Sequence, residues 1–403
     1  GNGSTKHHQI DELTEDNELK VRRSKRARVE TSFGPDFLTS FLTEHSSHCE
    51  FVNYTAFAYF IDSDPMTFEE AMNSVDSHLW KEASDSEVDS IKSNHTWDLV
   101  DLPRGCRAIG CKWIFKRKRR TDGSVERFKA RLVIKGFTQK KGIDFFDTYS
   151  PVTKISTIRM MFALASIHNM HVHQMDVKTA FLYGDLDEEI YMVQPPGYIE
   201  PGLEHKVCRL RKSLYGLKQA PKQWFEKFHS TICDFGFKAN NSDTCIYSKM
   251  TSNAYVFLCL YVDDMLIFST HVSAIEETKS FLTSKFEMKD LGEAEVILGV
   301  RVIRRGRGYV LSQAHYTENL LKKFNSWEVN PVRTPYDPSR HLERNMGIGV
   351  EQEEFARIIG SLMFLMNCTR PDLAYAINKL SRYTHNPSSE HWTALNRVLK
   401  YLK

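Results

Sequence analysis

The sequence lacks three features that would place it in common classes of protein. No apolar run in its 403 residues approaches the roughly 18 residues needed to cross a bilayer, and no apolar signal segment stands near the N-terminus. We therefore expect a soluble chain with no membrane partner that is not secreted by a signal of its own. The eight cysteines include no Cys-x-x-Cys pair, which argues against a zinc framework and a disulfide scaffold and favours reduced, mostly buried thiols.

The first 64 residues differ in composition from the remainder. Clusters of Asp, Glu, Ser, Thr and Asn surround the basic run at residues 22–28, with little apolar periodicity, so we expect residues 1–64 to be a disordered linker. The basic run fits a nuclear localisation signal, a nucleic-acid contact or a plain charged tether. The segment His45-Ser46-Ser47-His48-Cys49 has metal-ligand residue types, but no second group of ligands follows it.

Positive charge is concentrated in two segments. Residues 104–141 carry 14 Lys and Arg against two acids, and residues 206–227 carry seven against one. The formal net charge is +3, so the remaining residues together carry −15. This segregation predicts two local positive fields suited to a phosphate backbone. In the run Lys116-Arg117-Lys118-Arg119-Arg120, followed by a turn at Asp122-Gly123, we expect Arg117 and Arg119 to bind nucleic acid; a solvated hairpin end is the alternative.

Two adjacent carboxylates interrupt an apolar stretch at Tyr261-Val262-Asp263-Asp264. Both flanks are rich in β-branched and aromatic residues at strand length, which predicts a β-hairpin with the acids at its tip. Two like charges side by side are costly to desolvate unless a cation holds them, and carboxylate oxygens suit Mg²⁺. An ordinary turn on a solvated hairpin is the alternative.

A third carboxylate, Asp176, ends the strand-like run from His171 to Val177. An Asp at a strand end together with Asp263 and Asp264 is the set that two-metal phosphoryl transfer requires. Only the fold can bring Asp176 to the hairpin, because 87 residues of chain separate it from Asp263.

The order of these motifs resembles the reverse transcriptase of copia-type LTR retrotransposons, over residues 80–403. The matching segments are Lys112-Trp113-Ile114-Phe115-Lys116, Lys129-Ala130-Arg131-Leu132-Val133, Gln174-Met175-Asp176-Val177-Lys178-Thr179-Ala180-Phe181-Leu182, Ser213-Leu214-Tyr215-Gly216-Leu217-Lys218-Gln219-Ala220-Pro221, Tyr261-Val262-Asp263-Asp264, Ile359-Gly360-Ser361-Leu362-Met363, Thr369-Arg370-Pro371-Asp372 and His391-Trp392.

The resemblance implies an α+β fold of the right-hand polymerase kind, with a ferredoxin-like split βαβ palm. The fingers with part of the palm would occupy residues 76–170, the palm 171–300, and the thumb or connection 301–403, with the family's ribonuclease H domain absent. Periodicity predicts helices at 66–96, 157–168, 221–235, 274–286, 354–368, 371–382 and 390–402, and strands at 108–116, 128–135 and 296–304.

The resemblance also assigns roles to single residues. Asp176, Asp263 and Asp264 would be catalytic, with two Mg²⁺ (Mn²⁺ as the alternative) held by Asp176, Asp263 and the Val177 carbonyl, and with Asp264 as electrostatic support. Nucleotide contacts are expected from Lys116, Arg131, Phe181, Tyr215 and Gly216, in which Phe181 would exclude a ribose 2′-hydroxyl. Nucleic-acid contacts are expected from Lys218, Tyr261, Leu298, Gly299 and Arg301. Surface charge for the basic residues and plain core packing for Phe181 are the alternatives.

The implied function is RNA-directed DNA polymerase, a nucleotidyltransferase that extends a primer with dNTPs on an RNA or DNA template. Its partners would include the integrase and ribonuclease H segments of a parent Pol polyprotein. Its location would be intracellular, in cytoplasmic virus-like particles, with nuclear entry as a further expectation. The rival interpretation is a decayed or host-adopted fragment that binds nucleic acid or acts as a scaffold without catalysis.

Overall fold

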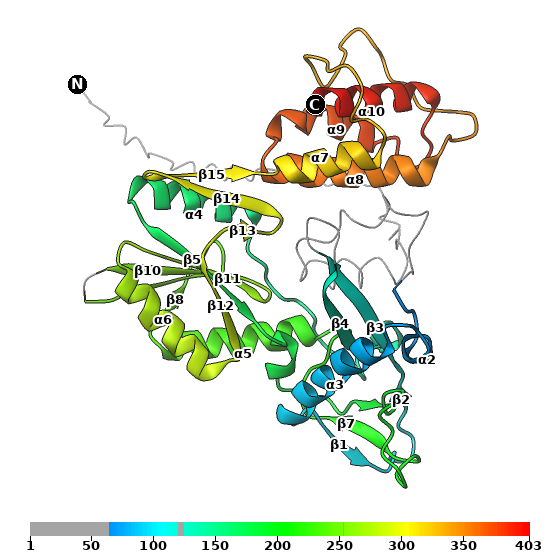
Figure 1. Ribbon diagram of the computed structural model, residues 1–403, viewed down its shortest axis with the longest axis vertical. Helices are drawn as coiled ribbons and strands as arrows, with labels where there is room; N and C mark the ends of the chain where they lie inside the picture. Colours follow the sequence, from blue (N-terminus) through cyan, green and yellow to red (C-terminus); the bar gives the residue numbers. More distant parts are fainter. Residues whose placement is uncertain (1–63, 120–124, 253) are drawn as a thin grey trace, which may run out of the picture.

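The computed structural model describes residues 64–119, 125–252 and 254–403 (Figure 1). The predicted linker, apart from Asp64, and the predicted turn at Asp122-Gly123 lie outside the described residues. Elsewhere the chain forms a mixed α+β fold, in agreement with the predicted class. Among the described residues, no helix combines the length and the apolar character needed to cross a membrane.

The largest sheet that the structure describes, the central sheet, is six-stranded and antiparallel and lies between α4 (Ile155–Ile167) on one side and two further helices, α5 (Ala220–Asp234) and α6 (Val272–Lys285), on the other (Figure 1). Its strands, in spatial order, are β12 (Met288–Glu293), β5 (His171–Val177), β11 (Asp264–Ser269), β10 (Tyr255–Tyr261), β9 (Ile246–Met250) and β8 (Lys238–Ala239). The predicted hairpin is therefore confirmed as β10 and β11, in the middle of this central sheet. The Asp176 strand is β5, directly beside β11.

Side chains of the central sheet alternate between two buried faces. Val256, Leu258 and Leu260 of β10 belong to one core with α5 (Ala220–Asp234) and α6 (Val272–Lys285). Cys259 belongs to a second core with α4 (Ile155–Ile167). Both faces of β10 are thus covered, which explains why its sequence reads as a continuous apolar run rather than an alternating one.

A long two-stranded ribbon, β3 (Cys111–Arg119) and β4 (Val125–Ile134), extends away from the central sheet. One face packs against α2 (Phe68–Met72) and α3 (Ser77–Ser93), where the Trp80 ring meets Phe115 and Phe128 at centroid distances of 5.4 and 4.6 Å. A small mixed sheet of β1 (Trp97–Val100), β7 (Val207–Leu210), β6 (Tyr191–Met192) and β2 (Ala108–Ile109) lies at one end of the ribbon.

The C-terminal part forms a helical unit with a core of its own. It consists of α7 (Ala314–Lys323), α8 (Gln352–Cys368), the 3₁₀ turn η3 (Pro371–Leu373), α9 (Ala374–Ser381) and α10 (Ser389–Leu402). A three-stranded sheet of β13 (Val296–Ile297), β14 (Val300–Arg305) and β15 (Gly308–Ser312) connects this helical unit to α4 and the central sheet (Figure 1).

Three expected elements differ from the structure. The helix expected at 66–96 is divided into α2 and α3, and Val75, which lies between them, is 89% exposed. The strand expected at 108–116 is interrupted at Gly110. The strand expected at 296–304 is wrong as a single element, because Leu298 and Gly299 have φ of 52° and 68° and turn the chain back as a hairpin.

Candidate active site

The three predicted carboxylates come together at one end of the central sheet. A two-residue turn, Val262-Asp263, joins β10 to β11, and Tyr261 pairs with Asp264 across it. Asp264 lies directly opposite Asp176 in the register of β11 and β5. The Val177 amide donates a hydrogen bond of 3.0 Å to the Asp263 carbonyl, so Asp263 is held beside the end of the same strand.

Burial and mutual repulsion make these carboxylates difficult to ionise together. Asp263 is 8% exposed, and burial, followed by the charges of Asp264 and Asp176, raises its pKa to about 8. Burial and Asp176 raise the pKa of Asp264 to about 6, although the Gln174 amide donates a hydrogen bond of 3.1 Å to its Oδ1. Burial also raises the pKa of Asp176, against the opposing charge of Lys129.

The site fits a hard divalent cation on its donor chemistry. Asp263 Oδ1 is buried and has no hydrogen-bond partner in the part of the chain that the structure describes. A cation between the carboxylates would satisfy this oxygen and remove the repulsion. Within the described ranges, no three His, Cys, Asp or Glu side chains are arranged to hold an ion unaided. Mg²⁺ commonly binds one or two carboxylates together with substrate phosphates and water, so incoming phosphates would complete the set.

The ribbon presents a basic face to these acids. Ile114 and Lys116 of β3 pair with Arg131 and Lys129 of β4, and strand alternation places all four on the face opposite α3. Lys118, two residues beyond Lys116, also acts electrostatically on Asp176 and Asp264. Burial, then the charges of Arg131 and Lys118, lower the pKa of Lys129 to about 8.

Arg131 is the predicted nucleotide contact that the structure connects most directly to the acids. It acts electrostatically on Asp263 and Asp176, and its guanidinium lies 4.8 Å from the centroid of the Tyr215 ring. Burial works against the charged guanidinium, but the surrounding Tyr215 and acids raise the pKa overall. Glu87 of α3 reaches the edge of β4, where it accepts a hydrogen bond of 3.3 Å from the Leu132 amide.

Phe181, Tyr215 and Gly216 lie together beside Arg131. Phe181, in the 3₁₀ turn η2 (Ala180–Tyr183), is 7% exposed and meets the Tyr215 ring edge-on at 5.0 Å. Gly216 has a φ of +95°, and an added Cβ would lie 2.2 Å from the Ile134 carbonyl oxygen. The close backbone approach that glycine permits here is therefore to β4. A contact between Gly216 and a nucleotide stays a prediction.

The remaining predicted contacts lie in several places. Lys218 extends over Phe145, with Nζ 4.6 Å from the ring centroid and 3.3 Å from the Gln139 carbonyl oxygen. Tyr261 is half-buried, and burial is the main cause of its pKa of about 12. Leu298 and Gly299 form the β13–β14 turn, and Arg301 is exposed on β14. They belong to the three-stranded sheet and not to the central sheet that carries the acids.

Arg117 does not have the role expected from the basic run. Its side chain lies on the α3 face of the ribbon, where its Nη2 is 3.1 Å from Asp76 Oδ2 and its guanidinium lies over the Trp80 ring. The residue is only 8% exposed. Strand alternation explains the error, because Arg117 points toward α3 while its neighbours Lys116 and Lys118 lie on the opposite face.

Sequence reasoning missed four residues that surround the acids or support them. Lys129 and Lys118 could have been found from the period of two shared with Arg131 and Lys116. Gln174 could have been found in the same way, since it is two residues from Asp176 on one face of β5. Trp224 gave no such signal, because its indole Nε1–H reaches the Val262 carbonyl, at 2.6 Å, only through the packing of α5 against the hairpin.

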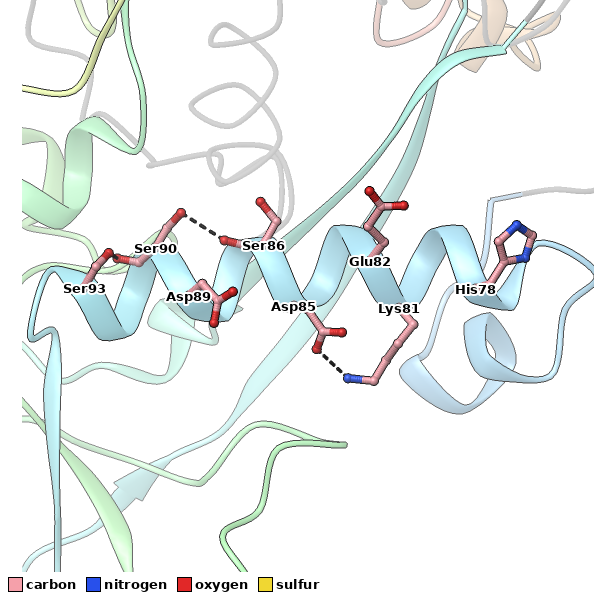
Figure 2. Close-up of a pocket in the computed structure, with 8 residues that line it drawn as sticks. All are labelled: His78, Lys81, Glu82, Asp85, Ser86, Asp89, Ser90 and Ser93. Atoms are coloured by element: carbon pink, nitrogen blue, oxygen red, sulfur yellow. Dashed lines mark hydrogen bonds and ion pairs between the residues drawn. The ribbon is translucent and has the colours of Figure 1, made fainter.

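The outer side of α3 carries a polar row of side chains that is separate from this site. Figure 2 shows His78, Lys81, Glu82, Asp85, Ser86, Asp89, Ser90 and Ser93 along one helix, with Lys81 paired to Asp85. The ribbon lies against other residues of the same helix, such as Trp80. We assign no chemistry to this surface.

Carboxylates that converge at one end of a sheet and face lysine and arginine are the arrangement that metal-dependent phosphoryl transfer requires. The model of a protein family described as reverse transcriptase (RNA-dependent DNA polymerase) matches residues 94–338. The chain belongs to this family, whose activity is a nucleotidyltransferase activity.

The similar proteins come from copia-type transposons. The chain is 42% identical to the retrovirus-related Pol polyprotein from transposon TNT 1-94 of Nicotiana tabacum, over 95% of the chain and 28% of that protein. It is 40% identical to the corresponding polyprotein from transposon RE2 of Arabidopsis thaliana, over 85% of the chain and 23% of that protein. A putative transposon Ty5-1 protein of Saccharomyces cerevisiae is 33% identical over 57% of the chain and 75% of that protein. The chain thus spans about a quarter of the length of the plant polyproteins.

Proposed function

We propose that this chain extends the 3′ end of a primer with dNTPs, on an RNA or DNA template. The observation that carries the proposal is the convergence of Asp176, Asp263 and Asp264 opposite the basic face of the ribbon. This arrangement places negative groups where metal-assisted attack would occur and positive groups where phosphates would lie. Family membership supports the same reaction.

The parts of the molecule would then have the following roles. The ribbon with α3 would be the fingers, the central sheet the palm, and the helical unit the thumb or connection. Other Pol segments, such as integrase and ribonuclease H, would accompany the chain in a parent polyprotein, as the names of its relatives suggest. An intracellular particle would be the place of synthesis.

The chain's own residues would divide the chemistry among them. Asp176, Asp263 and the Val177 carbonyl would hold Mg²⁺, and Asp264 would support them from the position opposite Asp176. The bound ions would lower the pKa of the primer hydroxyl and stabilise the leaving pyrophosphate oxygens. Arg131 and Lys129 would bind the triphosphate, with Arg131 oriented by the Tyr215 ring. Phe181, adjacent to Tyr215, would limit the space beside the sugar.

Primer extension on poly(rA)–oligo(dT) by the purified protein tests the proposal. Asp263→Asn removes the ionisable carboxyl that would bind the cation while it keeps the shape of the side chain. We expect this variant to lose DNA synthesis by roughly 10³-fold or more, since metal-dependent charge stabilisation is lost. Template–primer binding, measured by fluorescence anisotropy, should stay within about twofold because it depends on the basic surfaces.

Asp187→Asn, a change of the same kind in an exposed carboxylate of a loop, is the matched control and should leave synthesis unchanged. Parental activity in Asp263→Asn would refute the assigned metal site. A wild-type protein that binds template–primer but adds no nucleotide would favour the non-catalytic rival.

A further inference from the structure

The turn that carries Asp263 has a backbone conformation that its own sequence disfavours. Val262 has a φ of 58°, in the left-handed region, where the Cβ of an L-residue crowds the following carbonyl. A β-branched residue rarely adopts this conformation, and it persists only where the surroundings hold it in place. The metal-binding residue of the proposed function is thus the neighbour of a strained position.

Two hydrogen bonds from different elements hold the two peptide carbonyls of this turn. The indole Nε1–H of Trp224, on α5, donates to the Val262 carbonyl at 2.6 Å. The amide of Val177, at the end of β5, donates to the Asp263 carbonyl at 3.0 Å. The Asp263 side chain therefore projects from a backbone that is fixed on both sides.

Trp224 is itself immobilised by close packing. It is 1% exposed, and its ring contacts Tyr183, Phe228 and Phe286 at centroid distances of 6.1, 5.6 and 5.2 Å. The indole nitrogen connects it to the turn by a hydrogen bond, and a buried carbonyl that loses its donor is left unsatisfied. This hydrogen bond therefore couples the position of the Val262-Asp263 turn to the position of α5.

We propose that Trp224 is a positioning residue, whose indole N–H holds the strained Val262-Asp263 turn so that the Asp263 carboxylate stays beside Asp176. The inference rests on the proposed function for its link to catalysis. It goes beyond that function because Trp224 lies on a different element, is 1% exposed and would act through the Val262 carbonyl.

The substitution Trp224→Phe tests this role because it keeps an aromatic ring in the core and removes the donor. We expect kcat for dTTP addition to fall by roughly tenfold, from the loss of one buried hydrogen bond. KM for dTTP and the Kd for template–primer should change less than about twofold, since the buried indole offers neither ligand a surface to contact. The Mg²⁺ concentration for half-maximal activity should rise by roughly threefold or more, because Asp263 is less well placed.

Trp113→Phe is the matched control. Trp113 also donates its Nε1–H to a backbone carbonyl, that of Pro196 at 2.9 Å, but it lies on the ribbon among Phe68, Phe115 and Tyr198. This variant should keep wild-type kcat and Mg²⁺ dependence. Equal losses in both variants would show a general effect on packing and would overturn the proposal, as would a wild-type kcat in Trp224→Phe.

A Mn²⁺ titration followed by the EPR signal of the free ion separates this inference from the proposed function. Weaker Mn²⁺ binding by Trp224→Phe than by wild type and Trp113→Phe supports the positioning role even if wild type adds no nucleotide. In that case the proposed function fails and the positioning role remains. Identical Mn²⁺ binding in all three proteins, with an active wild type, would overturn the positioning role alone.

Discussion

Phe181 packs its ring against Tyr215, and Tyr215 in turn lies under the Arg131 guanidinium. This chain of contacts connects a largely buried aromatic residue to the group proposed to bind the triphosphate. A ring in this place would exclude a ribose 2′-hydroxyl by its volume alone, without any hydrogen bond. A preference for deoxynucleotides that depends on the volume of the ring should be lost when the ring is shortened, whereas one that depends on a hydrogen bond should not.

Phe181→Val should therefore reduce the preference for dTTP over UTP by roughly tenfold or more, because several ring carbons are removed from beside the sugar. Synthesis with dTTP should survive at reduced efficiency, since Asp176 and Asp263 are unchanged. Single-nucleotide extension with dTTP and UTP in parallel measures the ratio. Phe181→Tyr, which keeps the ring, should retain the wild-type ratio. Unchanged discrimination in the Val variant would mean that Phe181 is only a core residue.

At the residue scale, chemistry in one short segment could be predicted and chemistry between segments could not. The pair Asp263-Asp264 is recognisable because two charges interrupt an apolar run. The roles of Glu87 and Trp224 depend on contacts with residues 45 and 38 positions away, at the Leu132 amide and the Val262 carbonyl. Arg117 was wrongly expected to bind nucleic acid, because successive residues of a basic run on a strand point to opposite faces of the ribbon.

At the element scale, α10 begins with a histidine-dependent cap. The Ser388 hydroxyl accepts from the His391 amide, and the His391 Nδ1 accepts from the Ser388 amide at 2.8 Å. His391 is 1% exposed and stacks on Tyr383 at 3.9 Å. Burial lowers its pKa below the ordinary value of 6.5, so the folded helical unit favours the neutral ring.

The helical unit should consequently lose stability in acid. Below about pH 6.5 the unfolded chain binds a proton at this histidine that the folded chain does not, so the free energy of unfolding decreases as the pH falls. His391→Gln keeps an acceptor for the Ser388 amide and removes the titration. Thermal melts followed by circular dichroism at pH 5.5 and 7.5 should show a larger decrease in Tm for wild type than for His391→Gln. Equal decreases would contradict the assignment.

Helix positions followed from apolar periodicity, and the predicted α4, α5 and α6 agree with the structure to within about two residues at each end. The β13–β14 hairpin did not follow from the sequence, because its first turn position is Leu298, a residue type that rarely has positive φ. The presence of a strand could be predicted from the local sequence, whereas a turn at a residue type that disfavours positive φ could not. The local sequence gives no sign of this turn.

At the scale of the whole molecule, charge is segregated by face as well as by segment. The ribbon directs Lys116, Lys118, Lys129 and Arg131 to one side and apolar residues with Arg117 to the other. The first basic segment, residues 104–141, therefore overstates the surface available to nucleic acid, because Arg117 lies on the other face. Within the described residues of the ribbon, the face toward the acids is the one suited to a phosphate backbone.

Template–primer affinity should decrease steeply with salt, and the slope should depend on that face alone. Lys116→Ala/Lys118→Ala should lower the slope of log K against log salt by about 0.7–0.9 for each phosphate that the protein no longer neutralises. The control pair is Lys81→Ala/Lys322→Ala, which removes two exposed, ion-paired lysines from the outer side of α3 (Figure 2) and from α7. It changes net charge equally and should leave the slope unchanged. Fluorescence anisotropy between about 50 and 200 mM salt measures all three proteins. If both pairs lower the slope equally, binding depends on net charge, and the ribbon is not a specific groove.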